Sequence, residues 1–340
     1  MKRAGHILRH LICGFIVLFF SSRVLQADLS NGLVAWYPFD GNASDMSGNG
    51  NHGTVNGATL ATDRHGQANK AYSFGQQEYI STTSQIKGIN NGNQTISGWF
   101  YKLTGSGWNI FGSDSSSGGQ FHLIVNGGGT QLTFGESYFG GTNGDGPNTA
   151  NVSVPDGWNH VSVVGVGNSF SVFLNGQLVI SNAIRKALNN SNLNFGRHYA
   201  TAAYGRYSGS IDDVRVYNRA LTAAEVLALY NFEKPKIPLT DSNFQTAINL
   251  WFSDEANATA TYGHISDWNV SAVTDMSEAF KDRTDFNEDI GTWDVGNVTS
   301  FVRMFKNASS FNQPIGNWDT SSATTFLSIF EGASSFNQPI

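Results

Sequence analysis

Thr292-Trp-Asp-Val-Gly-Asn-Val-Thr-Ser-Phe-Val-Arg-Met-Phe-Lys-Asn-Ala-Ser-Ser-Phe-Asn-Gln-Pro-Ile-Gly316 is one unit of a repeat near the C-terminal end of this 340-residue chain. Residues 267–291 precede it and residues 317–340 follow it in the same register, with a period of 25. A period of roughly 20–50 residues is typical of a solenoid, in which each unit buries its apolar face only against its neighbours. The recurring apolar positions are Trp268, Trp293 and Trp318; Phe280, Phe305 and Phe330; Phe286, Phe311 and Phe336; and Ile290, Ile315 and Ile340.

Each unit is expected to combine a short strand with a helical turn. In the first unit, residues 272–276 fit a strand and residues 277–281 fit a helical turn, which predicts an α/β solenoid. A helix over residues 241–252, with Phe244, Ile248 and Trp251 on one stripe, is predicted before the first unit. The third unit stops at Ile340, one residue short of the period, so we expect residues 239–340 to be a truncated array that further repeats follow.

Residues 28–232 predict an all-β sandwich of two packed antiparallel sheets. Short apolar runs alternate with turn signals, and Asn175-Gly176 between residues 169–174 and 177–180 indicates a hairpin with a type I′ turn. Further strands are predicted at residues 34–39, 95–101, 121–125 and 160–164. A helix closes the region, because Thr222 and Glu225 form a capping-box pattern ahead of an apolar stripe. Residues 233–238, with two prolines, are predicted to be a linker.

The N-terminal segment indicates export. Basic residues precede an apolar run over residues 11–20, and Ala27 comes before Asp28, as in a secretory signal peptide over residues 1–27. The run is too short to cross a bilayer, which needs about 20 residues, so we expect no membrane span after cleavage. The single cysteine, Cys13, lies inside this segment, and the mature chain is expected to contain no disulfide. The predicted localisation is secreted or cell surface.

Charge is distributed unevenly along the chain. Residues 28–238 carry 13 acidic and 12 basic side chains, whereas residues 239–340 carry 13 acidic and 4 basic ones, a net charge of −9. A nucleic-acid partner would need a basic stripe, and the sequence has none. An extracellular glycan or protein is the expected partner.

Several motifs in the first part occur in a specific order and spacing. They are residues 36–40, 45–53, 156–161, 173–176 and 209–221. Together they resemble the laminin-G-like, concanavalin A-like jelly-roll family of secreted proteins over about residues 33–231. The resemblance implies a two-sheet sandwich that binds sugars or proteins and often holds a calcium ion.

The calcium that this resemblance implies would need hard oxygen ligands on turns. Matching the motifs to the family gives Asp40, Asp45 and Asp212 as candidate ligands, with carbonyl groups of residues 49–53. The alternative is that Asp45 only caps a turn and that Asp212 only pairs with Arg215 or a backbone N–H.

Catalysis is not expected. Glycoside cleavage needs two facing carboxylates, but Glu78 and Glu136 are isolated. Asp212 and Asp213 are adjacent on a predicted strand and are expected to point to opposite faces. His160 is expected to be a packed residue rather than a base. Exposed aromatic side chains could stack on sugar rings, the alternative being packing within the sheets; the candidates are Trp99, Tyr101, Trp108 and Tyr138.

The repeats are similar to the BspA-type leucine-rich-like repeats of bacterial surface proteins, on residues 293–299, 304–305 and 308–315. That resemblance implies an extracellular solenoid used for adhesion or protein contact. The leading hypothesis is therefore a secreted or surface-attached adhesion protein with a lectin-like sandwich. The alternatives are an accessory binding module of a larger extracellular hydrolase, and a display role in which the repeats act as a spacer.

Overall fold

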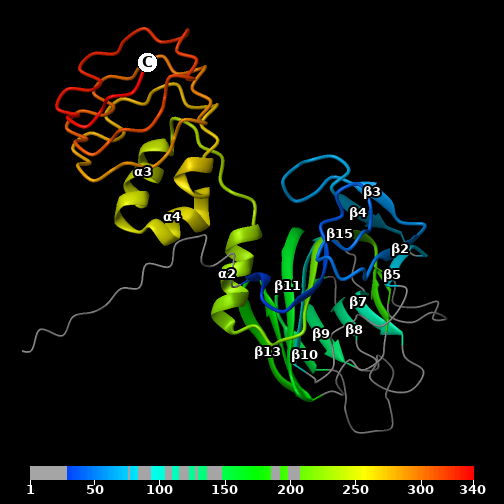
Figure 1. Ribbon diagram of the computed structural model, residues 1–340. Helices are drawn as coiled ribbons and strands as arrows, with labels where there is room; N and C mark the ends of the chain where they lie inside the picture. The colour runs from blue at the N-terminus through cyan, green and yellow to red at the C-terminus, as the bar shows by residue number, and fades with distance from the viewer. Residues whose placement is uncertain are drawn as a thin grey trace, which may run out of the picture.

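The computed structural model describes residues 29–75, 77–82, 93–103, 109–114, 122–126, 129–135, 148–184, 192–197 and 207–340. The described strands gather in one body and the repeats in another, and α2 and the segment after it connect them (Figure 1). The predicted signal peptide lies outside the described residues. Among the helices that are described, none combines the length and the apolar character needed to cross a membrane.

The first body is a sandwich of two antiparallel sheets, as the sequence predicts. The described part of sheet A has the order β13-β12-β11-β6-β15-β4-β3, with β1 also paired to β15, and that of sheet B has the order β10-β9-β8-β7-β14-β5-β2. Sheet A contains β1 (Leu33–Tyr37), β3 (Thr59–Ala61), β4 (Ala71–Phe74), β6 (Gln94–Lys102), β11 (Gly157–Val166), β12 (Ser169–Leu174), β13 (Gln177–Ile184) and β15 (Gly209–Tyr217). Sheet B contains β2 (Gly53–Asn56), β5 (Tyr79–Thr82), β7 (Asn109–Asp114), β8 (His122–Asn126), β9 (Gln131–Gly135), β10 (Asn148–Asn151) and β14 (Asn192–Phe195).

The core of the sandwich lies between the two sheets. Alternate residues of each strand point inward, so that Ile96 and Phe100 of β6 meet Phe111 of β7 and Phe195 of β14 in one apolar cluster. Gly98 of β6 is required there, because a Cβ at this position would lie 3.0 Å from both Phe111 and Val214.

Helix α2 (Ala223–Glu233) packs on the outer face of sheet A. The predicted capping box is confirmed: the Thr222 side chain accepts from the backbone N–H of Glu225, and the Glu225 side chain accepts from the N–H of Thr222. Val226 and Leu229 are buried against Tyr217 and other residues of a small second cluster. This helix therefore hides part of a sheet face that would otherwise be open to solvent.

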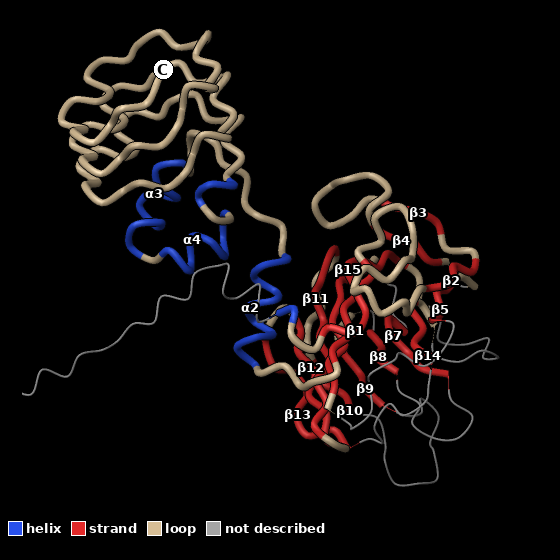
Figure 2. Tube along the Cα trace, in the orientation of Figure 1, coloured by secondary structure: helices blue, strands red, loops and turns tan. Residues whose placement is uncertain are grey.

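The second body begins with two helices and continues as stacked repeats. Helix α3 (Phe244–Ser253) confirms the helix predicted over residues 241–252, and α4 (Glu255–Tyr262) and a 3₁₀ turn, η1 (Ile265–Asp267), follow it. Figure 2 shows both helices at one end of a stack that consists of loop. Corresponding aromatic rings of successive units lie parallel, as in the Phe286–Phe311 and Phe311–Phe336 pairs, at 5.7 and 5.8 Å.

The predicted α/β character of the repeats is not shown. The predicted strand is reduced to isolated parallel bridges that join Asp275, Ser300 and Thr325, and residues 277–280 form turns. The reason lies in the backbone hydrogen bonds. The N–H groups of Met276 and Phe280 bond to carbonyl groups of the next unit, at Ser300 and Met304, instead of closing a helix within their own unit.

Candidate functional site

A row of polar and glycine residues crosses the face of sheet B that points away from the core. Strand pairing brings these positions side by side, one from each of six adjacent strands, whereas the residues next to them in each strand, such as Phe111, Leu123 and Leu193, are in the core cluster. We call these residues the polar row; in order across the sheet they are Gly135, His122, Gly112, Asn194, Ser81 and Thr54.

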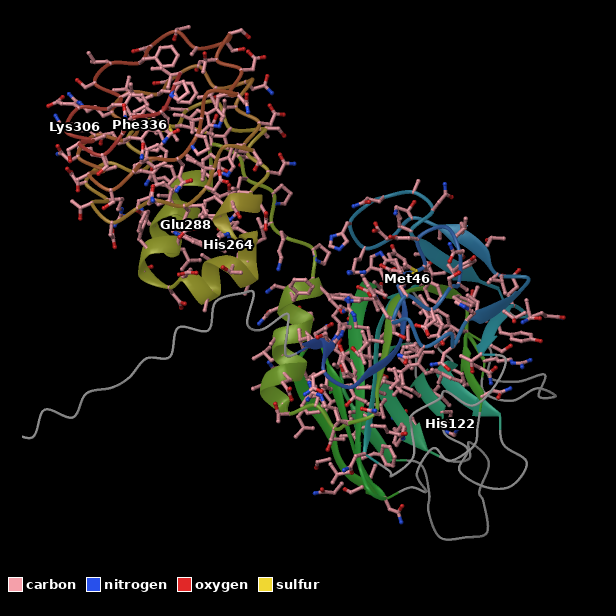
Figure 3. All side chains as sticks on the ribbon, viewed as in Figure 1. Met46, His122, His264, Glu288, Lys306 and Phe336 are labelled. Carbon is pink, nitrogen blue, oxygen red and sulfur yellow. The ribbon has the colours of Figure 1, made fainter. Side chains whose placement is uncertain are left out.

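The polar row contains two buried hydrogen-bonding side chains. His122 and Asn194 are fully buried, whereas Thr54, the last residue of the row, is exposed. Asn194 Oδ1 accepts from Arg197, at 3.4 Å, but its Nδ2 is buried with no hydrogen-bond partner. A buried polar group without a partner is rare in proteins, and one cause is a missing ligand. Figure 3, in which His122 is labelled, shows this residue among the strands of the first body.

Two glycines flank His122 in the polar row. Gly112 and Gly135 are its register partners on β7 and β9, so the two positions directly opposite His122 carry no side chain. Glycine within a strand often marks a point where a ligand or another backbone approaches closely. Farther along, the Arg197 guanidinium stacks on the Tyr79 ring, with Cζ 3.3 Å from the ring centroid.

Asp45, one of the three predicted calcium ligands, has its carboxylate engaged by the backbone. Its Oδ1 accepts from the N–H groups of Trp36 and Ser47, at 3.0 and 2.8 Å, and its Oδ2 accepts from that of Asn51, at 2.8 Å. Burial opposes ionisation, but these hydrogen bonds outweigh it and hold the pKa of Asp45 below its usual value. Asp45 therefore fixes the loop against β1, which matches the alternative in which it caps a turn.

The other two predicted ligands are also engaged elsewhere. Asp40 is half exposed and pairs with Lys70 at 3.2 Å, and buried Asp212 pairs with Arg64. In the described part of the chain, no group of three or more His, Cys, Asp or Glu side chains is arranged to hold a metal ion. The structure thus does not bring Asp40, Asp45 and Asp212 together as one ligand set, and calcium binding stays a prediction.

Asp212 and Asp213 do not point to opposite faces, so this expectation is wrong. Arg64 bonds to both carboxylates, through Nη1 to Asp212 and through Nη2 to Asp213 at 2.9 Å. The register of β15 shifts between Asp212 and Arg215, and Asp213 has φ +46°, in the left-handed region. This bulge breaks the two-residue alternation on which the expectation rested.

The bulge belongs to a buried polar network beneath the end of α2. Glu233 is 3% exposed, accepts from Trp99 Nε1 at 2.8 Å and pairs with Arg215, while its carbonyl oxygen accepts from Arg64 Nε. Asp213 also accepts from Trp36 Nε1, at 2.6 Å. Glu233, predicted to begin the linker, is therefore the last residue of α2 and part of the sandwich.

His160 is packed in this network, as predicted. It is fully buried, its Nε2 lies 2.8 Å from Ser97 Oγ and 3.5 Å from Glu233 Oε2, and burial lowers its pKa to about 3. A proton relay would use different ring nitrogens for the hydroxyl and the carboxylate, but here both face Nε2 and Nδ1 has no partner. The arrangement holds α2 on the sheet and does not have relay geometry.

The predicted sugar-stacking residues have different positions. Trp99 is buried beneath α2, where its ring stacks on Tyr230 at 5.8 Å, so the packing alternative holds for it. Tyr101 is 36% exposed. Trp108 and Tyr138 lie outside the described residues. No sequence pattern indicated Arg64, which its loop brings under α2, or the polar row, which only the strand register assembles.

Two sequence families match the chain, each over one of its two bodies. Residues 74–227 match the concanavalin A-like lectin/glucanases superfamily, and residues 243–340 match a family described as Mycoplasma protein of unknown function, DUF285. The first body is thus a concanavalin A-like jelly-roll domain. No curated protein matches the chain.

Solved structures with a similar fold include domain 4 of AbnA, an extracellular arabinanase from Geobacillus stearothermophilus in complex with arabinotriose. The match has 22% identity and a TM-score of 0.47, and covers 58% of this chain and 98% of that domain. Another is a structure of botulinum neurotoxin type C, a toxin whose cell entry is dependent upon interaction with two ganglioside molecules. That match has 16% identity and a TM-score of 0.49, and covers 64% of this chain and 55% of the toxin chain. This chain thus spans about half the length of that structure.

Proposed function

We propose that this protein acts outside the cell as a binding protein whose jelly-roll domain recognises a carbohydrate. The polar row of sheet B is the observation that carries the proposal. Asn194 is fully buried on this face and its Nδ2 has no hydrogen-bond partner, so a polar ligand would satisfy it. Such groups are the ones that orient a polar ligand.

The chemistry of the polar row favours a ligand rich in hydroxyl groups. The amide of Asn194 and the hydroxyl groups of Ser81 and Thr54 each donate and accept hydrogen bonds, as sugar hydroxyls also do. The side chains in the row include no acidic or permanently charged group, so the row offers hydrogen bonds rather than ion pairs. Arg197 and Tyr79 lie beside it, and the stacked pair presents a flat surface at its side.

The repeats have a separate role in this proposal. Residues 239–340 carry a net charge of −9, so they would contact basic protein surfaces or act as a spacer that displays the sandwich. Adhesion is the biological role that combines the two parts. We propose that the sandwich supplies specificity and that the chain has no catalytic activity of its own.

The test is binding of the full chain to a glycan array and to a panel of extracellular-matrix proteins. The Asn194→Ala variant should bind its glycan about tenfold more weakly than the wild type, since it removes a central hydrogen-bonding group. Asn151→Ala is the matched control, because Asn151 is exposed on β10 at the edge of the same sheet. An empty array together with an empty matrix panel would contradict the proposal.

A further inference from the structure

A second row of side chains crosses the outer face of sheet A, beyond the part that α2 covers. Coverage by α2 ends at Trp99, and Tyr101, two residues later on the same face of β6, is exposed. Strand pairing places one residue of each of five adjacent strands beside it. We call these residues the aromatic–hydroxyl row; in order they are Trp158, Tyr101, Ser210, Ser73 and Thr59.

All five side chains are uncharged, and none is buried. Tyr101 and Thr59 are exposed, and Trp158, Ser210 and Ser73 are partly exposed. The two rings contact each other edge to face, with centroids 5.5 Å apart and an interplanar angle of 78°. Because the rings are nearly perpendicular, one can lie against a flat ligand while the other supports it.

The backbone beneath the row is held in place. Tyr207 Oη donates to the carbonyl oxygen of Tyr101 at 2.6 Å and lies 3.1 Å from that of Ser210, which are register partners on β6 and β15. Gly209 permits this arrangement, because it has φ +155° and a Cβ there would lie 2.4 Å from the Tyr101 carbonyl oxygen. The row is therefore preorganised, which lowers the entropic cost of binding.

We propose that the aromatic–hydroxyl row is a second carbohydrate-binding site, which takes a neutral polysaccharide lying across the strands. An aromatic ring packs against the C–H face of a sugar, and three hydroxyl side chains follow it at the strand spacing of about 4.8 Å. The row thus offers one stacking position and then hydrogen bonds along a straight line, which suits an extended chain of sugars. The absence of charge in the five side chains favours a neutral chain over a uronic or sulfated one.

This site is independent of the polar row, because the two rows lie on the outward faces of opposite sheets. A ligand bound at one row leaves the other open, and the two sites together would let one sandwich bridge two glycan chains. The inference goes beyond the proposed function and does not require the polar row to bind anything.

The experiment is affinity electrophoresis of the full chain in gels that contain hydroxyethylcellulose, arabinoxylan or galactomannan, with polygalacturonate and chondroitin sulfate as anionic comparisons. At least one neutral polysaccharide should retard the wild-type chain, and the anionic ones should retard it less. Tyr101→Ala should weaken retardation roughly tenfold. Leu178→Ala, an exposed apolar residue on β13 of the same sheet, is the control and should have no effect.

Variants of the two rows separate the two proposals. Tyr79→Ala removes a tyrosine beside the polar row, and Tyr101→Ala removes one from the aromatic–hydroxyl row; circular dichroism checks that both variants fold. Loss of neutral-polysaccharide binding in Tyr101→Ala, with binding kept in Tyr79→Ala, supports the second site. Binding that survives Tyr101→Ala and Ser210→Ala but is lost in Tyr79→Ala overturns the second site and leaves the proposed function standing. A chain that no neutral polysaccharide retards also overturns the second site.

Discussion

The buried network beneath α2 contains more negative than positive side chains. Arg64 and Arg215 face three carboxylates, those of Asp212, Asp213 and Glu233. Burial raises the pKa of Asp212 to about 7, and the neighbouring charge of Asp213 acts in the same direction, against the effect of Arg64. Near neutral pH a proton on Asp212 would therefore leave two charges of each sign in the network. Asp212, which the family resemblance offers as a calcium ligand, bonds to Arg64 instead.

Glu233 is the side chain on which the position of α2 depends most. Glu233→Ala removes the acceptor of buried Trp99 Nε1 and one partner of the mostly buried Arg215, and should lower the free energy of unfolding by about 2–4 kcal/mol. Glu225→Ala is the matched control on the same helix. It removes half of a capping box and a partly exposed ion pair with Arg219, and should cost about 1 kcal/mol. Urea denaturation followed by fluorescence measures both, and equal losses would show that the network adds nothing to the helix cap.

The dependence of stability on pH provides a second test of the network. The pKa of Asp212 rises from 3.8 to about 7 on folding. Between about pH 4 and pH 7 the folded chain therefore keeps a proton that the unfolded chain has lost. The contribution of Asp212 is thus greatest below about pH 4 and falls as the pH rises to about 7, by at most about 1.4 kcal/mol per pH unit.

The titration of His160 changes stability with pH in the opposite direction. Burial lowers its pKa from 6.5 to about 3, so between these values only the unfolded chain binds the proton, and the contribution of His160 rises with pH. Asp212→Asn removes one of the two opposing effects. Urea unfolding between pH 4 and pH 6.5 should therefore show stability rising more steeply with pH in the variant than in the wild type. Parallel curves would mean that Asp212 does not keep its proton in this range.

At the scale of elements, the repeat is built from columns of rings. Trp293 is 3% exposed, lies parallel to Trp268 with centroids 6.1 Å apart, and donates from Nε1 to the carbonyl oxygen of Ile265 at 2.9 Å. It also meets Phe244 of α3 edge to face, so the first helix closes the end of the column. Each unit is therefore stabilised by its neighbours rather than by itself.

Trp293→Ala should be among the most damaging changes in the repeats. Loss of a buried indole that packs against Trp268, Phe280 and Phe244 should cost about 3–5 kcal/mol, because it leaves a cavity among these rings. Leu327→Ala, at a side chain that is 62% exposed, should change stability by less than about 0.5 kcal/mol. Thermal unfolding measures both, and a small effect of Trp293→Ala would show that the stack does not depend on the tryptophan column.

The sequence predicts those elements whose signals are local. The capping box of α2, the Asn175-Gly176 hairpin and the stripe of α3 each depend on a few neighbouring residues, and the structure has all three. The bulge at Asp213 and the position of Arg64 depend on contacts between distant segments, as do both rows of sheet residues. A strand sequence shows which residues alternate, but it does not show which residue of another strand lies beside them.

The calcium prediction concerns the jelly-roll domain as a whole. If calcium binds, the melting temperature should be higher in calcium than in chelator. The added stability should be about 2.7 kcal/mol at calcium concentrations 100-fold above Kd. Because Asp45 and Asp212 are engaged by backbone N–H groups and by Arg64, the half-exposed Asp40 is the candidate whose loss should matter most. Asp40→Asn should abolish the rise, and Asp156→Asn, at another exposed aspartate, should keep it. Equal melting in the two buffers would make the calcium prediction wrong.

At the scale of the whole molecule, the described residues form two separate large apolar cores. The sandwich cluster runs from Val34 to Val216 and the repeat cluster from Leu239 to Ile315, and they share no residue. Polar contacts hold the connecting segment, such as that of Ile237 N with the carbonyl oxygen of Thr261 at 3.0 Å. Bodies joined in this way unfold as separate units, since neither core needs the other to stay buried.

Calorimetry of the full chain should therefore show two transitions. Glu233→Ala should lower only the transition of the sandwich, and Trp293→Ala only that of the repeats, because each change affects one core. A single transition that both variants shift equally would show that the two bodies unfold together. In that case the linker would couple the domains, and a ligand bound to the sandwich would also stabilise the repeats; with two transitions, glycan binding should raise the sandwich transition alone.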